Sequence, residues 1–134
     1  MSIIFLALAA ICNAIMDTCV HHYYNSIFSK LDPNWWNGET SWKNKYFEGD
    51  PTKGRRFIFL GINYPVQLTD AFHFFKMLMI FFICASIISY TPCELFIDCG
   101  STFLSQLIMF VVYGVVWNST FSVFYNKLLI KRNL

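Results

Sequence analysis

The sequence contains few charged residues for its length. Lys and Arg number 10 and Asp and Glu number 8, or 13% of 134 residues, whereas a typical soluble domain has about 25%. Hydrophobic residues make up 56%, including 15 Phe, 7 Tyr and 4 Trp. A small soluble domain cannot bury so much apolar surface, because the buried share of the surface falls with chain length. The shortage of charge therefore excludes an ordinary soluble domain and indicates a membrane protein.

Several functional motifs are also missing. The chain has no Gly-rich phosphate loop, no nucleophile elbow and no Cys–His zinc module. Its net charge of +2, with no basic run interleaved with stacking aromatics, does not indicate nucleic-acid binding. The sequence therefore assigns no catalytic residue, and single polar side chains are the remaining candidates for a functional site.

Three apolar segments are long enough to cross a membrane as helices. They cover about residues 2–28, 68–90 and 101–129, and a bilayer core of roughly 30 Å needs about 20 helical residues. Helices are expected because backbone groups in lipid must form hydrogen bonds within the segment. We therefore predict an all-α, small polytopic membrane protein with a single membrane domain over residues 1–134. An aromatic-rich polar connection, residues 29–67, joins the first two spans, and a loop, residues 91–100, joins the last two.

The polar connection has its own local signals. Asp32 followed by Pro33 predicts the start of a short helix, because Asp is a good N-cap and Pro fits the first helical position. The three tryptophans of the connection fit either a belt at the level of the lipid headgroups or loop packing against the helices; they are Trp35, Trp36 and Trp42. Residues 57–62, FIFLGI, are too short to span and predict an interfacial or extended piece.

Lys and Arg are distributed unevenly around the predicted spans. The polar connection carries Lys30, Lys43, Lys45, Lys53, Arg55 and Arg56, and the C-terminal tail carries Lys131 and Arg132. The loop at residues 91–100 has two acids and no base. The positive-inside rule then places the connection and the C-terminus in the cytoplasm and the N-terminus outside, in the cytoplasmic membrane if the source is prokaryotic. Arg55 and Arg56 could contact anionic headgroups, or could serve only to fix this topology.

The five cysteines fall into two groups. Cys12, Cys19 and Cys84 lie within apolar spans, where we expect them to pack as small hydrophobic residues. Cys93 and Cys99 lie in the loop predicted outside, where an oxidising compartment would allow a disulfide, although spacing alone does not determine one.

Polar residues gather at one end of the first two spans. Asn13, Asp17 and His21 are four residues apart and share a helix face, and Asp70 and His73 are neighbours on the second span. Because these spans run in opposite directions, both Asp–His pairs are expected at one depth, near the cytoplasmic side.

Two carboxylates and two imidazoles are ligands that suit Zn²⁺, Mn²⁺ or Fe²⁺. The predicted metal ligands are Asp17, His21, Asp70 and His73, with Asn13, Tyr24 and Lys76 acting beside them. Two other interpretations stay open. The pairs could be polar contacts that hold the helices together, with Asp70 as a helix cap and Lys76 reaching the headgroups, or they could form a proton or ion path.

Three classes of function follow. The first is a structural or accessory membrane protein that forms a homo-oligomer or joins a membrane-protein partner, because three helices leave little interior for polar residues. The second is a metal-dependent membrane enzyme that works at the headgroup level. The third is an oligomeric pore or lysis-type channel lined by Asn13, Asp17 and Gln106. All three have the lipid bilayer as a partner, and none involves nucleic acid.

Overall fold

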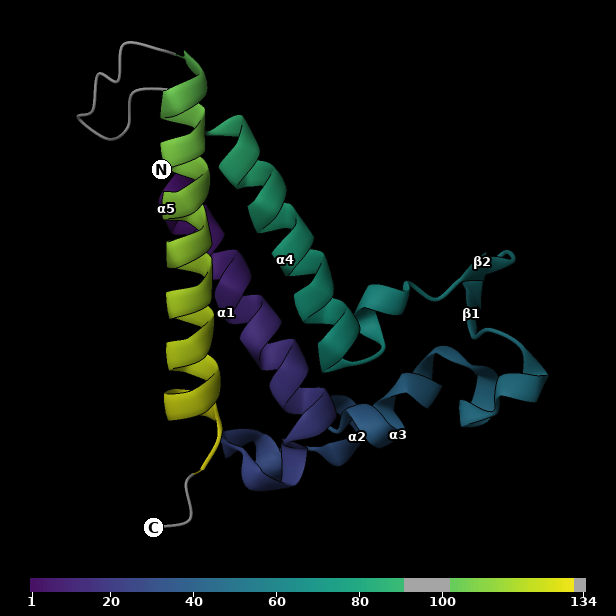
Figure 1. The fold of residues 1–134 in the computed structure, drawn as a ribbon. Coiled ribbons are helices and arrows are strands. Elements are labelled where there is room, and N and C mark those ends of the chain that lie inside the picture. The colour runs from purple at the N-terminus through teal and green to yellow at the C-terminus, as the bar shows by residue number, and fades with distance from the viewer. Residues whose placement is uncertain (91–101, 132–134) are drawn as a thin grey trace.

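The computed structural model of the protein describes residues 1–90 and 102–131, and it is mostly helical (Figure 1). Its long helices are α1 (Ser2–His21), α4 (Ala71–Ile88) and α5 (Thr102–Val123), and α5 continues directly into a π-helix, Phe124–Leu129. Three helical segments are long and apolar enough to cross a membrane: α1, α4 and the stretch Phe103–Leu129. The prediction of a mostly helical chain with three candidate spans is confirmed.

Helix α1 lies at the centre of the bundle, because it packs against both α4 and α5. Ala9, Ala10 and Ala14 are fully buried in α1, and small residues of this kind let helix backbones approach closely. Buried residues make up 39% of the apolar stretch of α1, 11% of that of α4 and 6% of that of Phe103–Leu129. The two outer segments therefore expose most of their apolar surface.

The three helices also meet through polar contacts at the N-terminal end of α1. Ser86 Oγ on α4 donates a hydrogen bond of 2.9 Å to the Ser2 carbonyl oxygen, and the Tyr113 hydroxyl on α5 donates one of 2.6 Å to Ser2 Oγ. A cleft of about 360 Å³ lies beside these contacts and is lined mainly by apolar side chains of α4 and α5. Ser2 therefore links both outer helices to α1.

The polar connection forms short helical pieces at the other end of the bundle. The chain between α1 and α4 contains the α-helices α2 (Pro33–Trp36) and α3 (Gly38–Ser41) and the 3₁₀ turns Tyr23–Asn25, Ile27–Lys30, Trp42–Lys45, Phe47–Gly49, Pro51–Lys53 and Val66–Leu68. Asp32 Oδ1 accepts a hydrogen bond of 2.9 Å from the Asn34 amide ahead of α2, so the predicted cap is confirmed. The Trp36 ring stacks on Phe28 with ring centroids 4.6 Å apart, which is the loop-packing arrangement.

Helix α1 ends at His21, before residue 28, where the first span was predicted to end. The reason is Ser26, whose hydroxyl donates to the Tyr23 carbonyl oxygen at 2.8 Å and accepts from the Phe28 amide at 3.1 Å. These bonds stabilise turns in place of further helix. Similarly, α4 begins at Ala71 and not at residue 68, because the side chain of Asp70 caps it.

A small hairpin interrupts the helical chain. Strands β1 (Phe57–Phe59) and β2 (Ile62–Asn63) pair in antiparallel fashion, with Phe59 opposite Ile62. Leu60 and Gly61 form the two-residue turn with φ angles of 50° and 76°, the positive values that a mirror-image hairpin turn requires. The all-α prediction therefore needs this correction: a short run rich in aromatic and β-branched residues forms an extended ribbon here.

The end of the third span is tied to the first connection. Ile130 forms an isolated β-bridge with Ser26, and the Lys131 amide donates a 2.7 Å hydrogen bond to the Asn25 carbonyl oxygen. Lys131 Nζ also donates to Ser29 Oγ at 2.9 Å. The C-terminal end of the helical chain and the first connection thus lie at the same end of the bundle. The predicted loop at residues 91–100, with Cys93 and Cys99, lies outside the described residues.

Gly38→Ala is expected to destabilise the packing of α3 on α1. An added Cβ would lie 3.0 Å from the Val20 Cα atom and 3.1 Å from the Cys19 carbonyl oxygen. Because these are backbone atoms, the substitution should lower the free energy of unfolding by about 1–3 kcal/mol. Thermal unfolding in detergent, followed by circular dichroism, measures this change.

The matched control for this substitution is Gly114→Ala on α5, where an added Cβ meets nothing within 4 Å. Alanine is favoured over glycine inside a helix by about 1 kcal/mol, so this variant should be at least as stable as the wild type. Equal stability of the two variants would contradict the close approach at Gly38.

Candidate functional site

The polar residues singled out in the sequence lie at the end of the bundle where α1 ends and α4 begins. Figure 1 shows α2 and α3 at this same end. Val20, near the C-terminal end of α1, lines the same cavity as Asp70 and His73 at the start of α4. The C-terminal end of α1 and the N-terminal end of α4 are therefore at matching depth, as the sequence predicted.

Asp70 is held by four contacts from its own neighbourhood and is only 1% exposed. Its Oδ1 atom accepts a 2.9 Å hydrogen bond from the His73 amide, which caps α4. Its Oδ2 atom accepts from Thr69 Oγ1 at 2.9 Å and lies 2.7 Å from His73 Nδ1. Its backbone carbonyl accepts from the Phe74 amide at 3.1 Å. The cap interpretation of Asp70 is thus observed, and the capped residue also holds the imidazole.

The Asp70–His73 pair opens onto a cavity of about 200 Å³. Ser41 of α3, Trp42 and Phe72 line the same cavity, and Ser41 is buried. His73 Nδ1 lies within hydrogen-bonding distance of Asp70 Oδ2, so Nε2 is the ring nitrogen outside this contact. A His fixed by a carboxylate in this way can exchange a proton or bind a ligand through Nε2. The pair is the best-defined polar arrangement at this end of the bundle.

Asp17 lies on another side of α1. The half-buried Asp17 carboxylate is close enough to the Tyr125 hydroxyl, in the π-helix that follows α5, to interact with it electrostatically. His21 is exposed, and the next residue, His22, packs its ring edge-on against Tyr125 with centroids 5.5 Å apart. The Asp17 side of α1 therefore faces the third span, whereas the Asp70–His73 pair belongs to the side covered by α4.

The four predicted metal ligands are consequently not brought together. Within residues 1–90 and 102–131, no group of three or more His, Cys, Asp and Glu side chains could hold a metal ion. Of the residues expected beside the ligands, Lys76 places its Nζ 5.9 Å from the centroid of the Phe72 ring, and Asn13 is half-buried on α1. A bound metal stays a prediction of the sequence, with no assembled ligand set to support it.

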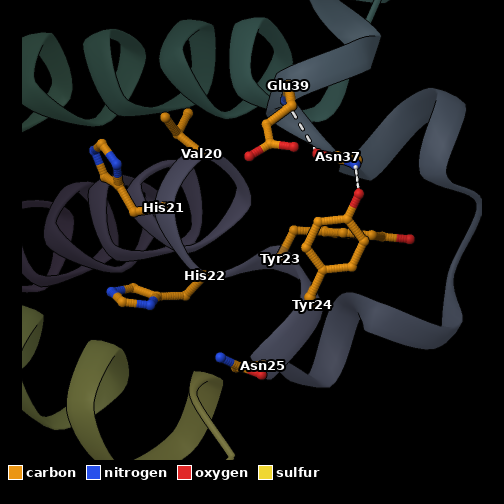
Figure 2. Close-up of a pocket in the computed structure, with 8 residues that line it drawn as sticks. All are labelled: Val20, His21, His22, Tyr23, Tyr24, Asn25, Asn37 and Glu39. Carbon is orange, nitrogen blue, oxygen red and sulfur yellow. Dashed lines mark hydrogen bonds between the residues drawn. The ribbon is translucent and has the colours of Figure 1, made fainter.

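A second, smaller polar pocket of about 70 Å³ lies at the end of α1 (Figure 2). Tyr24, the remaining residue predicted beside the ligands, lines it together with Asn37, whose Nδ2 donates to the Tyr24 hydroxyl at 3.1 Å. Asn37 Oδ1 accepts from the Glu39 amide at 3.0 Å. The pocket has room for a few water molecules, and its amide and phenol groups mainly fasten α3 to the end of α1.

The adjacent Tyr23 is buried and fixes the turn after α1. Its hydroxyl donates a 2.8 Å hydrogen bond to the Leu31 carbonyl oxygen. Burial raises the pKa of the Tyr23 phenol, and the nearby Tyr24 and Asp32 raise it further. The phenol therefore keeps its proton, and its role as a donor, well above neutral pH.

The sequence did not identify the residues of α3 that face this region. Asn37 and Gly38 carry a turn signal, because Asn-Gly is a common turn dipeptide, but that signal does not show that Gly38 approaches α1. Nothing in the local sequence singles out Ser41. Arg55 and Arg56, predicted to contact headgroups, lie apart from the cavity, at the base of the β1–β2 hairpin.

The fold and the site define a mostly helical protein with three candidate membrane spans and a polar end that holds one Asp–His pair. Comparisons with family models, curated proteins and solved structures find no match for the chain.

Asp70→Ala is expected to lower the free energy of unfolding by about 1–2 kcal/mol, the usual cost of losing an N-cap. Asp70→Asn keeps a capping side chain but loses the carboxylate next to His73, so its effect should be smaller. Chemical denaturation in detergent measures both variants. The control is Asp17→Asn, which should stay within about 0.5 kcal/mol of the wild type. If Asp17→Asn lowered the free energy of unfolding as much as Asp70→Ala, the result would contradict the conclusion that Asp70 caps a helix and Asp17 does not.

Proposed function

We propose that the protein is a small integral membrane protein of structural or accessory type, which crosses the bilayer three times and acts through helix packing. The observation that carries this proposal is the exposure of α4 and of Phe103–Leu129, where only 11% and 6% of the apolar stretch is buried. Side chains such as Phe81, Phe103 and Phe110 are more than half exposed. Lipid tails, or the helices of a membrane partner, suit such surfaces.

The proposed orientation has the N-terminus outside and the C-terminus in the cytoplasm. It is supported by the position of the basic residues, since the first connection and Lys131 lie at one end of the bundle. Short cytoplasmic loops carry an excess of Lys and Arg. The polar end, with its short helices α2 and α3, would then lie on the cytoplasmic side of the membrane.

A membrane enzyme that works at the headgroup level is the second candidate. The observation that favours it is the Asp70–His73 pair beside a cavity of about 200 Å³. Against it, the Asp70 carboxylate already has a structural role, because its Oδ1 atom accepts from the His73 amide and caps α4. A metal-dependent form of this enzyme would further require Asp17, which lies near Tyr125, to approach the Asp70–His73 pair.

An oligomeric pore is the least supported of the three classes. Its expected lining residues Asp17 and Gln106 lie toward opposite ends of the third span: Asp17 is near Tyr125, whereas Gln106 is in the fifth position of α5. Gln106 lines the mainly apolar cleft between the helices. A conducting lumen needs a more continuous polar surface than these residues supply.

Different tags on the N-terminus and the C-terminus of one chain test the spanning and its direction. In sealed membrane vesicles, a protease added on the cytoplasmic side should remove the C-terminal tag and leave the N-terminal tag, because three spans place the termini on opposite sides. Alkaline extraction should leave the protein in the membrane fraction. Release by alkali, or removal of both tags from one side, would contradict three spans.

The metal content of detergent-purified protein separates the accessory protein from the metal-dependent enzyme. Without chelators, the wild type is expected to contain no stoichiometric zinc, manganese or iron by mass spectrometry, because the four predicted ligands are not assembled. Near-stoichiometric metal that is lost in both Asp17→Ala and His73→Ala, but kept in Asp50→Ala, would overturn the accessory assignment. Asp50 is the control because it is a carboxylate of the connection away from the Asp–His pairs.

A further inference from the structure

The β1–β2 hairpin exposes an almost continuous set of large apolar side chains. The exposed fractions are 62% for Phe57, 55% for Ile58, 70% for Phe59, 82% for Leu60 and 66% for Ile62. Both faces of the ribbon are exposed, so it has no core of its own. A two-stranded hairpin of this kind is marginally stable in water, and an apolar patch next to charge indicates a binding surface.

The turn of the hairpin places a large apolar residue at a position where the backbone disfavours it. Leu60 has a φ angle of 50°, in a region where glycine, asparagine and aspartate are the usual residues. Strained residues of this kind point to a function for the side chain that is presented. The hairpin thus presents a leucine at its tip in spite of the strained backbone.

The base of the hairpin is basic and is hydrogen-bonded to the preceding part of the connection. The Arg56 amide donates to the Lys45 carbonyl oxygen at 3.0 Å, and the Tyr64 amide donates to the Arg56 carbonyl oxygen at 2.7 Å. The Arg56 guanidinium lies 5.2 Å from the centroid of the Tyr64 ring, and Arg55 forms an isolated bridge with Tyr46. No ion pair to Arg55 or Arg56 occurs within the described part of the chain. Their charge is therefore available to an anionic partner.

The position of the hairpin relative to α4 also favours contact with a membrane. Figure 1 shows β1 and β2 off to the side of the bundle, on the α4 side of α2 and α3 and at the level of the N-terminal half of α4. Residues 64–70 alone connect β2 to α4. If α4 begins at the membrane surface, a bilayer around the bundle would also reach the tip of the hairpin.

We propose that the hairpin inserts its apolar tip, Phe59, Leu60 and Ile62, into the cytoplasmic leaflet, while Arg55 and Arg56 bind anionic headgroups. This inference rests on the proposed function, because it requires α4 to span the bilayer. The tip reaches the boundary between headgroups and acyl chains and goes no deeper, since the open strand edges keep backbone groups that lipid tails cannot satisfy. The hairpin is thus an interfacial anchor beside the three spans.

The test is a fluorescent amino acid, dansylalanine, introduced in place of Leu60 in the full-length protein. The protein is reconstituted in vesicles of equal parts phosphatidylcholine and phosphatidylglycerol. Quenching by lipids brominated on their acyl chains reports insertion, and quenching by iodide reports contact with water. We expect strong quenching by the bromolipids and protection from iodide. Arg55→Gln/Arg56→Gln, or vesicles of phosphatidylcholine alone, should shift the balance toward iodide.

Two positions serve as controls with the same probe: Phe81, an exposed residue of α4, and Thr52, an exposed polar residue of the connection. Iodide quenching at position 60 equal to that at Thr52 would overturn the proposal, while bromolipid quenching at Phe81 would show that α4 still spans. Iodide quenching at position 60 is also the result expected if the ribbon binds a soluble protein instead of lipid. Iodide quenching at Phe81 would instead overturn the spanning arrangement on which the inference rests.

Discussion

Close contact along α1 is the interaction on which the rest of the structure depends. Both outer spans pack on this one helix, and its buried alanines let their backbones approach it. Ser2 at one end and the turn after His21 at the other are also points where α1 meets the other segments. A change along α1 therefore acts on both outer helices at once, whereas a change on the outer face of α5 meets few protein neighbours.

The three long helices and the cap at Asp32 could be predicted because each depends on local sequence. Length and hydropathy define the spans, and an Asp–Pro pair defines a helix start whatever lies around it. The direction in which Asp17 points could not be predicted in this way. Its spacing from His21 places both on one face of α1, but α1 has a neighbour on more than one side. The apolar residues of α1 are spread almost evenly around the helix, so their pattern does not show which face meets α4 and which meets Tyr125.

Long-range contacts explain the remaining differences. The first helix stops at His21 because the Ser26 side chain bonds to the backbone of Tyr23 and Phe28 and stabilises turns there. A hydropathy pattern does not predict such bonds. The approach of Gly38 to Val20 joins residues that are far apart in the chain. Residues 57–62 have too little length to decide between helix and strand by periodicity; the turn at Leu60 and Gly61 decides it.

The π-helix at the end of α5 sets the rotation of everything that follows it. A π-turn holds about one more residue than an α-turn, so Phe124–Leu129 behaves like an α-helix with a residue inserted. Without that insertion, the chain after Leu129 would be turned by about 100° around the helix axis. Leu129 is buried here, and Lys131 meets Asn25 just beyond it. The extra residue of the π-helix therefore rotates the chain about the helix axis, so that the end of the third helix meets the connection that follows the first helix.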